Sequence, residues 1–191
     1  MVALSKAATA FLTRKSGKGL PRTSRRASPA AVRGALVFAI PALLLLMAAP
    51  ARSASNKVKI TNLSDIAFGT VANLGVDAVR SENVCLYAET ASNGYNITAA
   101  GTGPGGTFQL SSGSVAMSFE VQWSSSSGQS SGAQLTPNVP LTGQVSSAVQ
   151  QNCNAGPATT ASLIILLRSA ALSRARAGSY NGTLTLVVGP E

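Results

Sequence analysis

The sequence predicts an all-β sandwich that follows an N-terminal leader. Beyond Ala51 charged residues are few, and Ser, Thr, Gly, Val and Leu dominate the composition. Short runs of alternating apolar and polar residues recur there, and clusters of Gly, Pro and Ser separate them. This combination is typical of β-sandwiches. A segment of about 140 residues is long enough for one domain with its own core.

The positive charge of the chain is concentrated at the N-terminus. The net charge is +9, but eight of the fifteen Lys and Arg residues lie within the first 33 positions, where Asp and Glu do not occur. Beyond Ala51, seven basic residues stand against six acidic ones, a net charge of +1. The basic charge therefore indicates targeting and gives no reason to expect a nucleic-acid partner.

An apolar run at residues 34–49 follows the basic region. Pro41 interrupts this run, and the run is shorter than the roughly 18 to 20 residues needed to span a bilayer. The triplet Ala-Pro-Ala that ends at Ala51 is a pattern that signal peptidase recognises. We therefore expect a signal peptide at 1–51, an exported domain at 52–191, cleavage after Ala51 or else after Ala54, and no stable membrane span. An uncleaved anchor and a misassigned start codon are the alternatives.

The first half of the domain shows three strand patterns. Alternating residues at 58–60 and 66–68 predict a first strand that bends or is interrupted at 62–65. A second strand is expected at 83–89 and a third at 95–99. The glycine-rich segment 101–106 predicts a turn; it lacks the Gly-Lys-Ser/Thr ending and the following helix of a phosphate-binding loop.

The second half begins with a predicted hairpin of residues 108–110 and 117–123, in which Phe119, Val121 and Trp123 share one face. Residues 124–132, almost entirely Ser, Gly and Gln, predict an exposed loop that buries nothing. Residues 159–167 fit a helix or a strand, and β-branching favours the strand. The last predicted strand, 179–188, has the alternating set Leu184, Leu186 and Val188 on one face.

The two cysteines, Cys85 and Cys153, both lie in the exported domain. An even number of cysteines in an oxidising compartment predicts one disulfide, and two cysteines allow only one pairing. Closing so long a loop is worth about 4 kcal/mol on the chain-entropy model. A metal or redox role is not expected, because the chain has no histidine and no C-x-x-C sequence.

The residue inventory argues against an enzyme and against a cofactor. Without histidine the Ser-His-Asp, Cys-His and histidine–metal arrangements are impossible. The acidic residues are scattered singly, so no carboxylate pair is apparent. Arg168, Arg174 and Arg176 predict a solvated face, with a contact to an acidic partner as the alternative. Trp123 and Tyr95 fit core positions better than a sugar-binding platform.

Several segments resemble the spore coat protein U domain, a family that includes subunits of archaic chaperone-usher pili. The matching segments run in order along nearly all of the exported domain: NGYNITAAGTG at 93–103, FQL at 108–110, FEVQW at 119–123, LTP at 135–137, LTGQ at 141–144, CNAGP at 153–157, AGSYNGTLTL at 177–186, and the terminal GPE.

The resemblance implies an immunoglobulin-like β-sandwich that lacks its final strand and has a hydrophobic groove beside the C-terminal strand. Leu184, Leu186 and Val188 would line one wall of that groove, although ordinary core positions would show the same alternation. In such pili a periplasmic PapD-like chaperone lends a strand, and a neighbouring pilus subunit, added at the outer-membrane usher, later replaces it by β-strand addition. The implied location is the periplasm and then a cell-surface fimbrium.

Two departures from the family pattern concern the start of the domain. Residues 57–60 lack the cysteine that major pilins of this type commonly carry near the first strand. If cleavage follows Ala51, only residues 52–56 precede that strand, whereas a donor segment needs roughly ten residues at ~3.3 Å each. The sequence therefore predicts a structural or adhesive subunit that accepts a strand without donating one, as a tip or minor subunit does. The alternative is a freestanding secreted sandwich that coats the cell or spore surface or binds carbohydrate.

Overall fold

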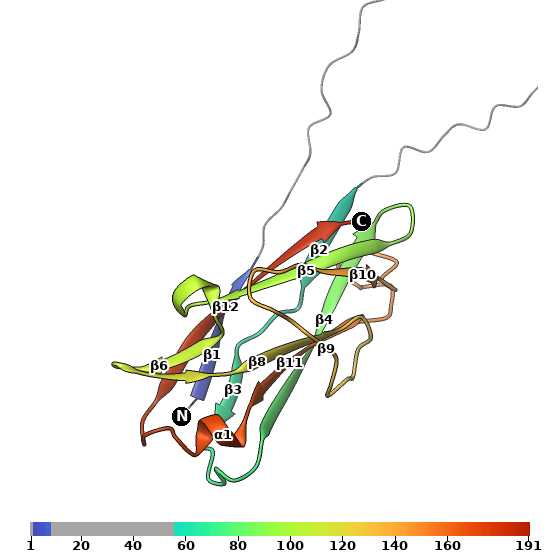
Figure 1. Cartoon of the computed structure of the whole chain (residues 1–191). Helices are drawn as coiled ribbons and strands as arrows, with labels where there is room; N and C mark the ends of the chain where they lie inside the picture. The colour runs from blue at the N-terminus through green and yellow to red at the C-terminus, as the bar shows by residue number, and fades with distance from the viewer. Residues whose placement is uncertain (1, 9–55) are drawn as a thin grey trace, which may run out of the picture. The chain divides into compact units, whose positions relative to one another are not determined.

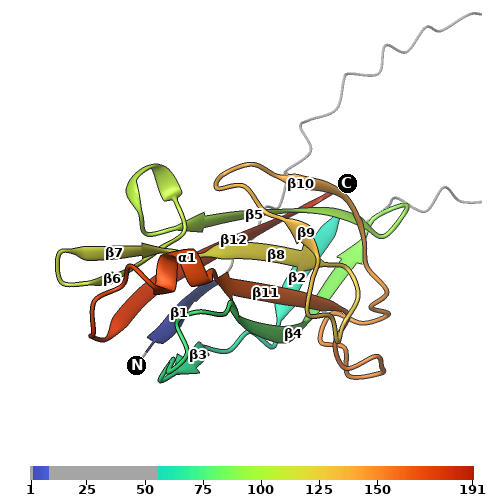
Figure 2. The same ribbon diagram turned by 60° about the horizontal axis from the view of Figure 1, so that its bottom comes forward.

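The computed structural model describes residues 2–8 and 56–191, which belong to one compact unit. The expected cleavage sites and the apolar run 34–49 lie outside the described residues. Two sheets, in which most neighbouring strands are antiparallel, pack against each other, as Figures 1 and 2 show. The predicted all-β sandwich is therefore confirmed. In the described part of the chain, no helix is both long and apolar enough to cross a membrane.

The larger sheet has seven strands, in the order β10-β5-β12-β1-β3, with β6 pairing with both β12 and β7. Their bounds are β1 (Val2–Ala8), β3 (Ile66–Gly69), β5 (Gly94–Gly101), β6 (Gln109–Ser112), β7 (Val115–Ser118), β10 (Leu141–Val145) and β12 (Tyr180–Pro190). The smaller sheet has five strands, in the order β2-β4-β11-β8-β9. Their bounds are β2 (Lys57–Thr61), β4 (Ala78–Glu89), β8 (Glu120–Ser124), β9 (Ala133–Gln134) and β11 (Ala161–Leu167).

The first strand of the domain is interrupted where the sequence predicts it. β2 pairs with β4 in the smaller sheet, whereas β3 belongs to the larger sheet. Between them Asn62 adopts a positive φ of 64°, a conformation that Asn tolerates better than most residues. The carboxylate of Glu82 accepts hydrogen bonds from the backbone N–H and the hydroxyl of Ser64, which holds the crossing segment against β4. The chain therefore changes sheets within a few residues.

The expected hairpin of residues 108–110 and 117–123 is wrong in one respect. The alternating run is divided at Phe119 into β7, which pairs with β6 in the larger sheet, and β8, which pairs with β11 in the smaller one. The N–H of Phe119 donates to the carbonyl of Phe108 at 3.1 Å. Side chains at alternate positions still face the core on both sides of the switch, so the period of two continues through it.

Residues 161–167 form a strand, not a helix, and every residue of β11 is buried. The predicted exposed loop 124–132 covers its outer face with backbone groups. The buried hydroxyl of Ser162 lies 3.0 Å from the N–H of Gln129, 3.0 Å from the carbonyl of Ser126 and 2.9 Å from Oδ1 of Asn83. None of residues 124–132 is buried, so the predicted exposed loop is confirmed, but its backbone groups also cover a polar site on the central strand, which the sequence did not predict.

One continuous apolar core fills the space between the sheets. At its centre the indole N–H of Trp123 on β8 donates to the hydroxyl of Tyr95 on β5 at 3.0 Å. The two rings meet edge to face, with 6.4 Å between their centroids. Both side chains are almost fully buried, so the expected core role of this pair is confirmed.

Candidate functional site

The position between β12 and β3, which we call the slot, is the most distinctive feature of the larger sheet. It is filled by β1, which is separated in sequence from the rest of the described fold by the long segment 9–55. β1 runs parallel to β12 in unbroken register from Val2 opposite Tyr180 to Ala8 opposite Leu186. It runs antiparallel to β3, with Leu4 opposite Ile66. The sheet is therefore complete only when this remote segment is present.

β3 depends on the slot for its place in the sheet. In the described ranges its only strand partner is β1, because β2 pairs with β4 in the other sheet and the chain has already crossed between the layers. On the other side of the slot, β12 is anchored independently through its pairing with β5, from Leu184 opposite Gly101 to Pro190 opposite Tyr95. An empty slot would leave the backbone N–H and C=O groups of both flanking strands without partners, and such edges favour aggregation.

The groove residues predicted from the sequence lie on the strand that borders the slot. Leu184, Leu186 and Val188 of β12 have exposed fractions of 4%, 3% and 5% and belong to the central core. Ile66 and Phe68 of β3 are buried in the same core from the other side of the slot. Burial at these positions agrees with a groove wall and with ordinary core packing, so the groove assignment stays a prediction.

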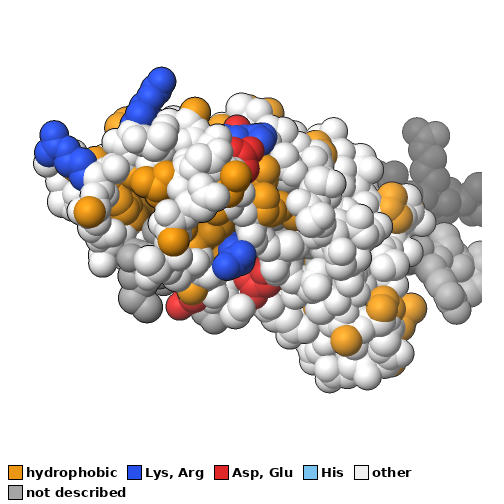
Figure 3. All heavy atoms as spheres, turned by 90° about the horizontal axis from the view of Figure 1, so that it is seen from below, with side chains coloured by type: hydrophobic (Ala, Val, Ile, Leu, Met, Phe, Trp, Pro, Cys, Tyr) orange, Lys and Arg blue, Asp and Glu red, His pale blue; other side chains and the backbone are white. Residues whose placement is uncertain are grey.

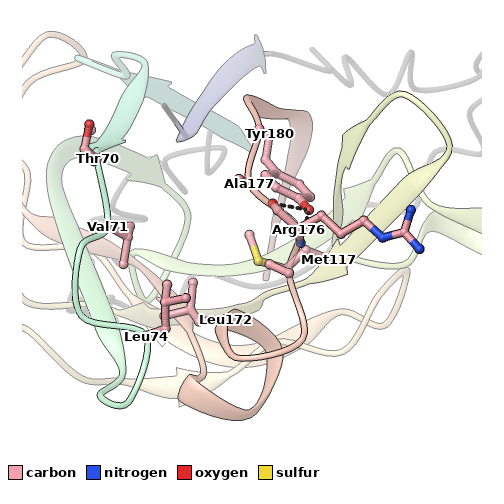
Figure 4. A pocket seen from close by; sticks show the side chains of 11 residues that line it. Thr70, Val71, Leu74, Met117, Leu172, Arg176, Ala177 and Tyr180 are labelled. Atoms are coloured by element: carbon pink, nitrogen blue, oxygen red, sulfur yellow. Dashed lines mark hydrogen bonds between the residues drawn. The ribbon is translucent and has the colours of Figure 1, made fainter.

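A cavity of about 380 Å³ lies at the end of the slot where β12 begins. Its walls come from the loop after β3, from β7, from α1 (Ser169–Leu172) and from the segment before β12, and they are mostly apolar: Val71, Leu74, Met117, Leu172 and Tyr180 (Figure 4). Figure 3, which views the molecule from below, shows apolar side chains gathered in a hollow on that face. The Tyr180 hydroxyl accepts from the N–H of Arg176 and donates to its carbonyl, both at 3.0 Å, which fixes the segment before β12.

Of the three predicted solvated arginines, Arg168 is paired. Its guanidinium donates to Glu120 at 2.9 and 2.6 Å and to Asp77 at 2.9 Å. Asp77 also accepts from the N–H of Ser169 at the start of α1. This N–H, together with Arg168, lowers the pKa of Asp77, while Glu120 and Asp77 raise that of Arg168. This exposed network therefore joins the residue before β4, the first residue of β8 and the start of α1.

Arg174 and Arg176, the other two predicted solvated arginines, are exposed. Neither belongs to a salt bridge found in the described part of the chain. Their exposure agrees with the solvated-face prediction, and the alternative of a contact to an acidic partner stays untested.

The predicted disulfide joins Cys85 on β4 to Cys153 in the segment after β10, with 6.0 Å between their Cα atoms. Hydrogen bonds attach the same segment to β4 at one residue: the hydroxyls of Ser146 and Thr160 both donate to the carbonyl of Leu86, at 2.5 and 2.9 Å. The crosslink therefore fastens a long connection to the smaller sheet and does not touch the strands that border the slot.

The described ranges 2–8 and 56–191 show no group of three or more His, Cys, Asp or Glu side chains placed to hold a metal ion. A second, more polar hollow of about 470 Å³ lies where the first strand crosses between sheets and is lined in part by Asn62, Asp65, Arg80 and Glu82. The slot is therefore the feature with the clearest capacity for binding, and what it binds is an extended backbone. Sequence reasoning missed its occupant, since no pattern in residues 2–8 distinguishes them from the rest of the leader.

No protein-family model matches the sequence, and no curated protein matches it significantly. A solved structure described as a chaperone–tip adhesin complex of CFA/I fimbriae aligns with 71% of this chain and 41% of that chain, at 14% sequence identity and a TM-score of 0.46. This chain thus spans less than half of the chain it matches, and so distant a likeness does not establish a common function. The resemblance to the spore coat protein U domain stays a prediction.

Proposed function

We propose that this protein is a structural or adhesive subunit of a bacterial chaperone-usher surface fibre, and that it accepts a strand from another protein. The observation that supports this proposal most directly is the slot. The position between β12 and β3 in the larger sheet is filled by a segment that is remote in sequence. β-strand addition suits such a site, because the open backbone edges provide affinity and the apolar lining provides specificity.

The partners follow from the folding problem that an empty slot creates. A subunit that reaches the periplasm with two unpaired strand edges and a solvent-exposed apolar groove would aggregate. A PapD-like chaperone therefore supplies a strand first. At the outer-membrane usher the strand of a neighbouring pilus subunit replaces it. The disulfide agrees with an oxidising, exported location that ends at the cell surface.

The short segment before β2 bears on the position in the fibre. With cleavage after Ala51, only residues 52–56 precede Lys57, too few to cross a neighbour's slot at ~3.3 Å per residue. A mature chain that begins there would accept a strand and donate none, which supports a role as a tip or minor subunit.

One observation favours the freestanding secreted sandwich as a second candidate. The strand that fills the slot belongs to this chain, so a mature protein that kept Val2–Ala8 would need no partner to complete its sheet. The two candidates therefore differ in whether the exported protein retains its first residues.

The test is export of the full chain, tagged after Glu191, with and without a candidate PapD-like chaperone. We expect an intact mass that begins at Arg52 or Ser55, little monomer alone, and a stable complex when the chaperone is present. The matched control is the same chaperone with the alternating apolar residues of its donor strand changed to Ser, which should not form the complex. A stable monomer that retains residues 2–8 and ignores the chaperone would favour the freestanding sandwich.

A further inference from the structure

We propose that residues Val2–Ala8 are an internal donor strand that keeps the sandwich closed in the uncleaved chain, so that removal of the leader opens the slot. The inference rests on the slot proposed above as the acceptor of a partner's strand. It assigns to the start of the leader a second role besides targeting, as a segment that competes with every external donor.

The pairing of β1 is that of an interior strand. It contacts β12 along its whole length, from Val2 opposite Tyr180 to Ala8 opposite Leu186, with no register shift. Its first residues also pair with β3, with a single irregularity after Val2. Segment 2–8 contains neither Pro nor Gly, so every residue has the N–H and the backbone stiffness that an interior strand needs.

The direction of β1 suits a donor that belongs to the same chain. Ala8 lies opposite Leu186, so β1 leaves the slot toward the end of β12, where the N–H of Glu191 donates to the carbonyl of Gly94. β2 begins at this same end of the sandwich, since Lys57 lies opposite Glu89, just before the turn that leads to Gly94. The last residue of β1 and the first residue of β2 therefore lie at the same end of the sandwich.

An intramolecular strand has an advantage over a partner at low concentration. A tethered donor acts at an effective concentration near millimolar for short flexible links and lower for longer ones, which exceeds the free concentration of most partners. While the tether is intact, an external strand must displace β1. Once the chain is cut after Ala51, a displaced β1 is lost by dilution, and the slot becomes available to a partner.

The first experiment uses the full chain, produced in an oxidising cytoplasm so that residue 1 is kept, with an intact mass as proof. Leu4→Pro and Ser5→Pro are introduced together, because successive N–H groups of an interior strand point to opposite neighbours and the pair removes one bond on each side. The probe is a labelled synthetic peptide with the sequence of residues 1–10. We expect the variant to bind it at least about tenfold more tightly than the wild-type chain does.

The same variant should exchange the amide hydrogens of β3 and those of Tyr180–Leu186 that face β1 at least about tenfold faster, since these groups lose their partner strand. The matched control is Ala30→Pro with Ala31→Pro, two prolines in segment 9–55, which should leave peptide binding and exchange unchanged. Equal binding and equal exchange in the wild-type chain and the Leu4→Pro, Ser5→Pro variant would overturn the proposal.

A second experiment does not depend on the folding of the proline variant. A protease site is inserted after Arg26 in the otherwise wild-type chain, which is then cut and passed through a gel-filtration column. A strand seated in the slot keeps fragment 1–26 with the body, and we expect co-elution; a fragment that separates from a folded body overturns the proposal. If the separated body then binds the chaperone, the internal donor is wrong and the acceptor function stands. If the body binds neither fragment 1–26 nor the chaperone, the acceptor function is also wrong.

Discussion

The isolated domain 52–191 should be unstable without a strand in its slot, and supplying one should rescue it. Four core side chains flank the slot, namely Ile66, Phe68, Leu184 and Leu186. Full exposure would cost about 1.5 to 3 kcal/mol each, or about 6 to 12 kcal/mol together as an upper bound. Even half of this loss is comparable with the total stability of a domain, about 5 to 15 kcal/mol. We therefore expect unfused 52–191 to aggregate or to be readily proteolysed.

The rescue uses a donor of about twelve to fifteen residues fused after Glu191 through a flexible linker, enough to cover the seven residue pairs that β1 makes with β12. Because the donor turns back from the end of β12, it would enter antiparallel to that strand, whereas β1 is parallel to it. Recovery of about 3 kcal/mol or more should raise the melting temperature by about 10 °C.

The assay is the melting temperature together with the monomeric fraction in gel filtration. The control is the same fusion with the alternating apolar residues of the donor changed to Ser, which keeps length and linker but removes the burial. Unfused 52–191 that is monomeric and cooperatively folded, with the melting temperature of both fusions, would refute the reasoning, and the freestanding sandwich would then become the leading candidate.

Three further predictions concern the body of the domain. Protein purified from an oxidising compartment and then denatured should show no free thiol, and reduction of the Cys85–Cys153 bond should lower the free energy of unfolding by about 4 kcal/mol; two reactive thiols per chain before reduction would contradict this. Burial raises the pKa of Tyr95 to about 12, so most of its tyrosinate absorbance should be missing at pH 11 in the folded protein, and stability should fall as the pH rises from the unfolded pKa of 10.0 toward 12; ordinary titration would contradict the burial of the Tyr95 hydroxyl. Ser162→Ala should cost about 1 to 3 kcal/mol in urea unfolding, because the hydrogen bonds that the buried Ser162 hydroxyl makes to Gln129, Ser126 and Asn83 are lost, whereas the exposed Ser130→Ala serves as a neutral control; equal effects would show that the loop does not seal β11.

The features that the sequence predicts correctly are those with a local cause. The break at 62–65 carries an Asn that accepts a positive φ between two alternating runs. The strand at 161–167 is a continuous apolar run rich in branched side chains, as expected for a strand buried on both faces. The two cysteines allow only one pairing, and the structure contains it.

The features that the sequence does not reveal depend on distant parts of the chain. Alternation continues from Met117 through Phe119 to Trp123 because both sheets face one core, so nothing local marks the change of sheet at Phe119. The cover over Ser162 comes from backbone groups, which composition does not encode. The strand at Val2–Ala8 is specified by the unpaired edges of β12 and β3, and these exist only once the rest of the sandwich has formed.

The interior location of the slot has a consequence for how long a bound strand stays there. A strand at the edge of a sheet can peel away from its single neighbour one hydrogen bond at a time. A strand between β12 and β3 is held on both sides, and β3 has no other strand partner in the described ranges, so withdrawal also releases β3 from its sheet. The barrier to departure then includes the loss of both ladders. The lifetime of such a joint is set by the rate of opening rather than by its equilibrium constant, which suits an assembly that must persist without any supply of free partner.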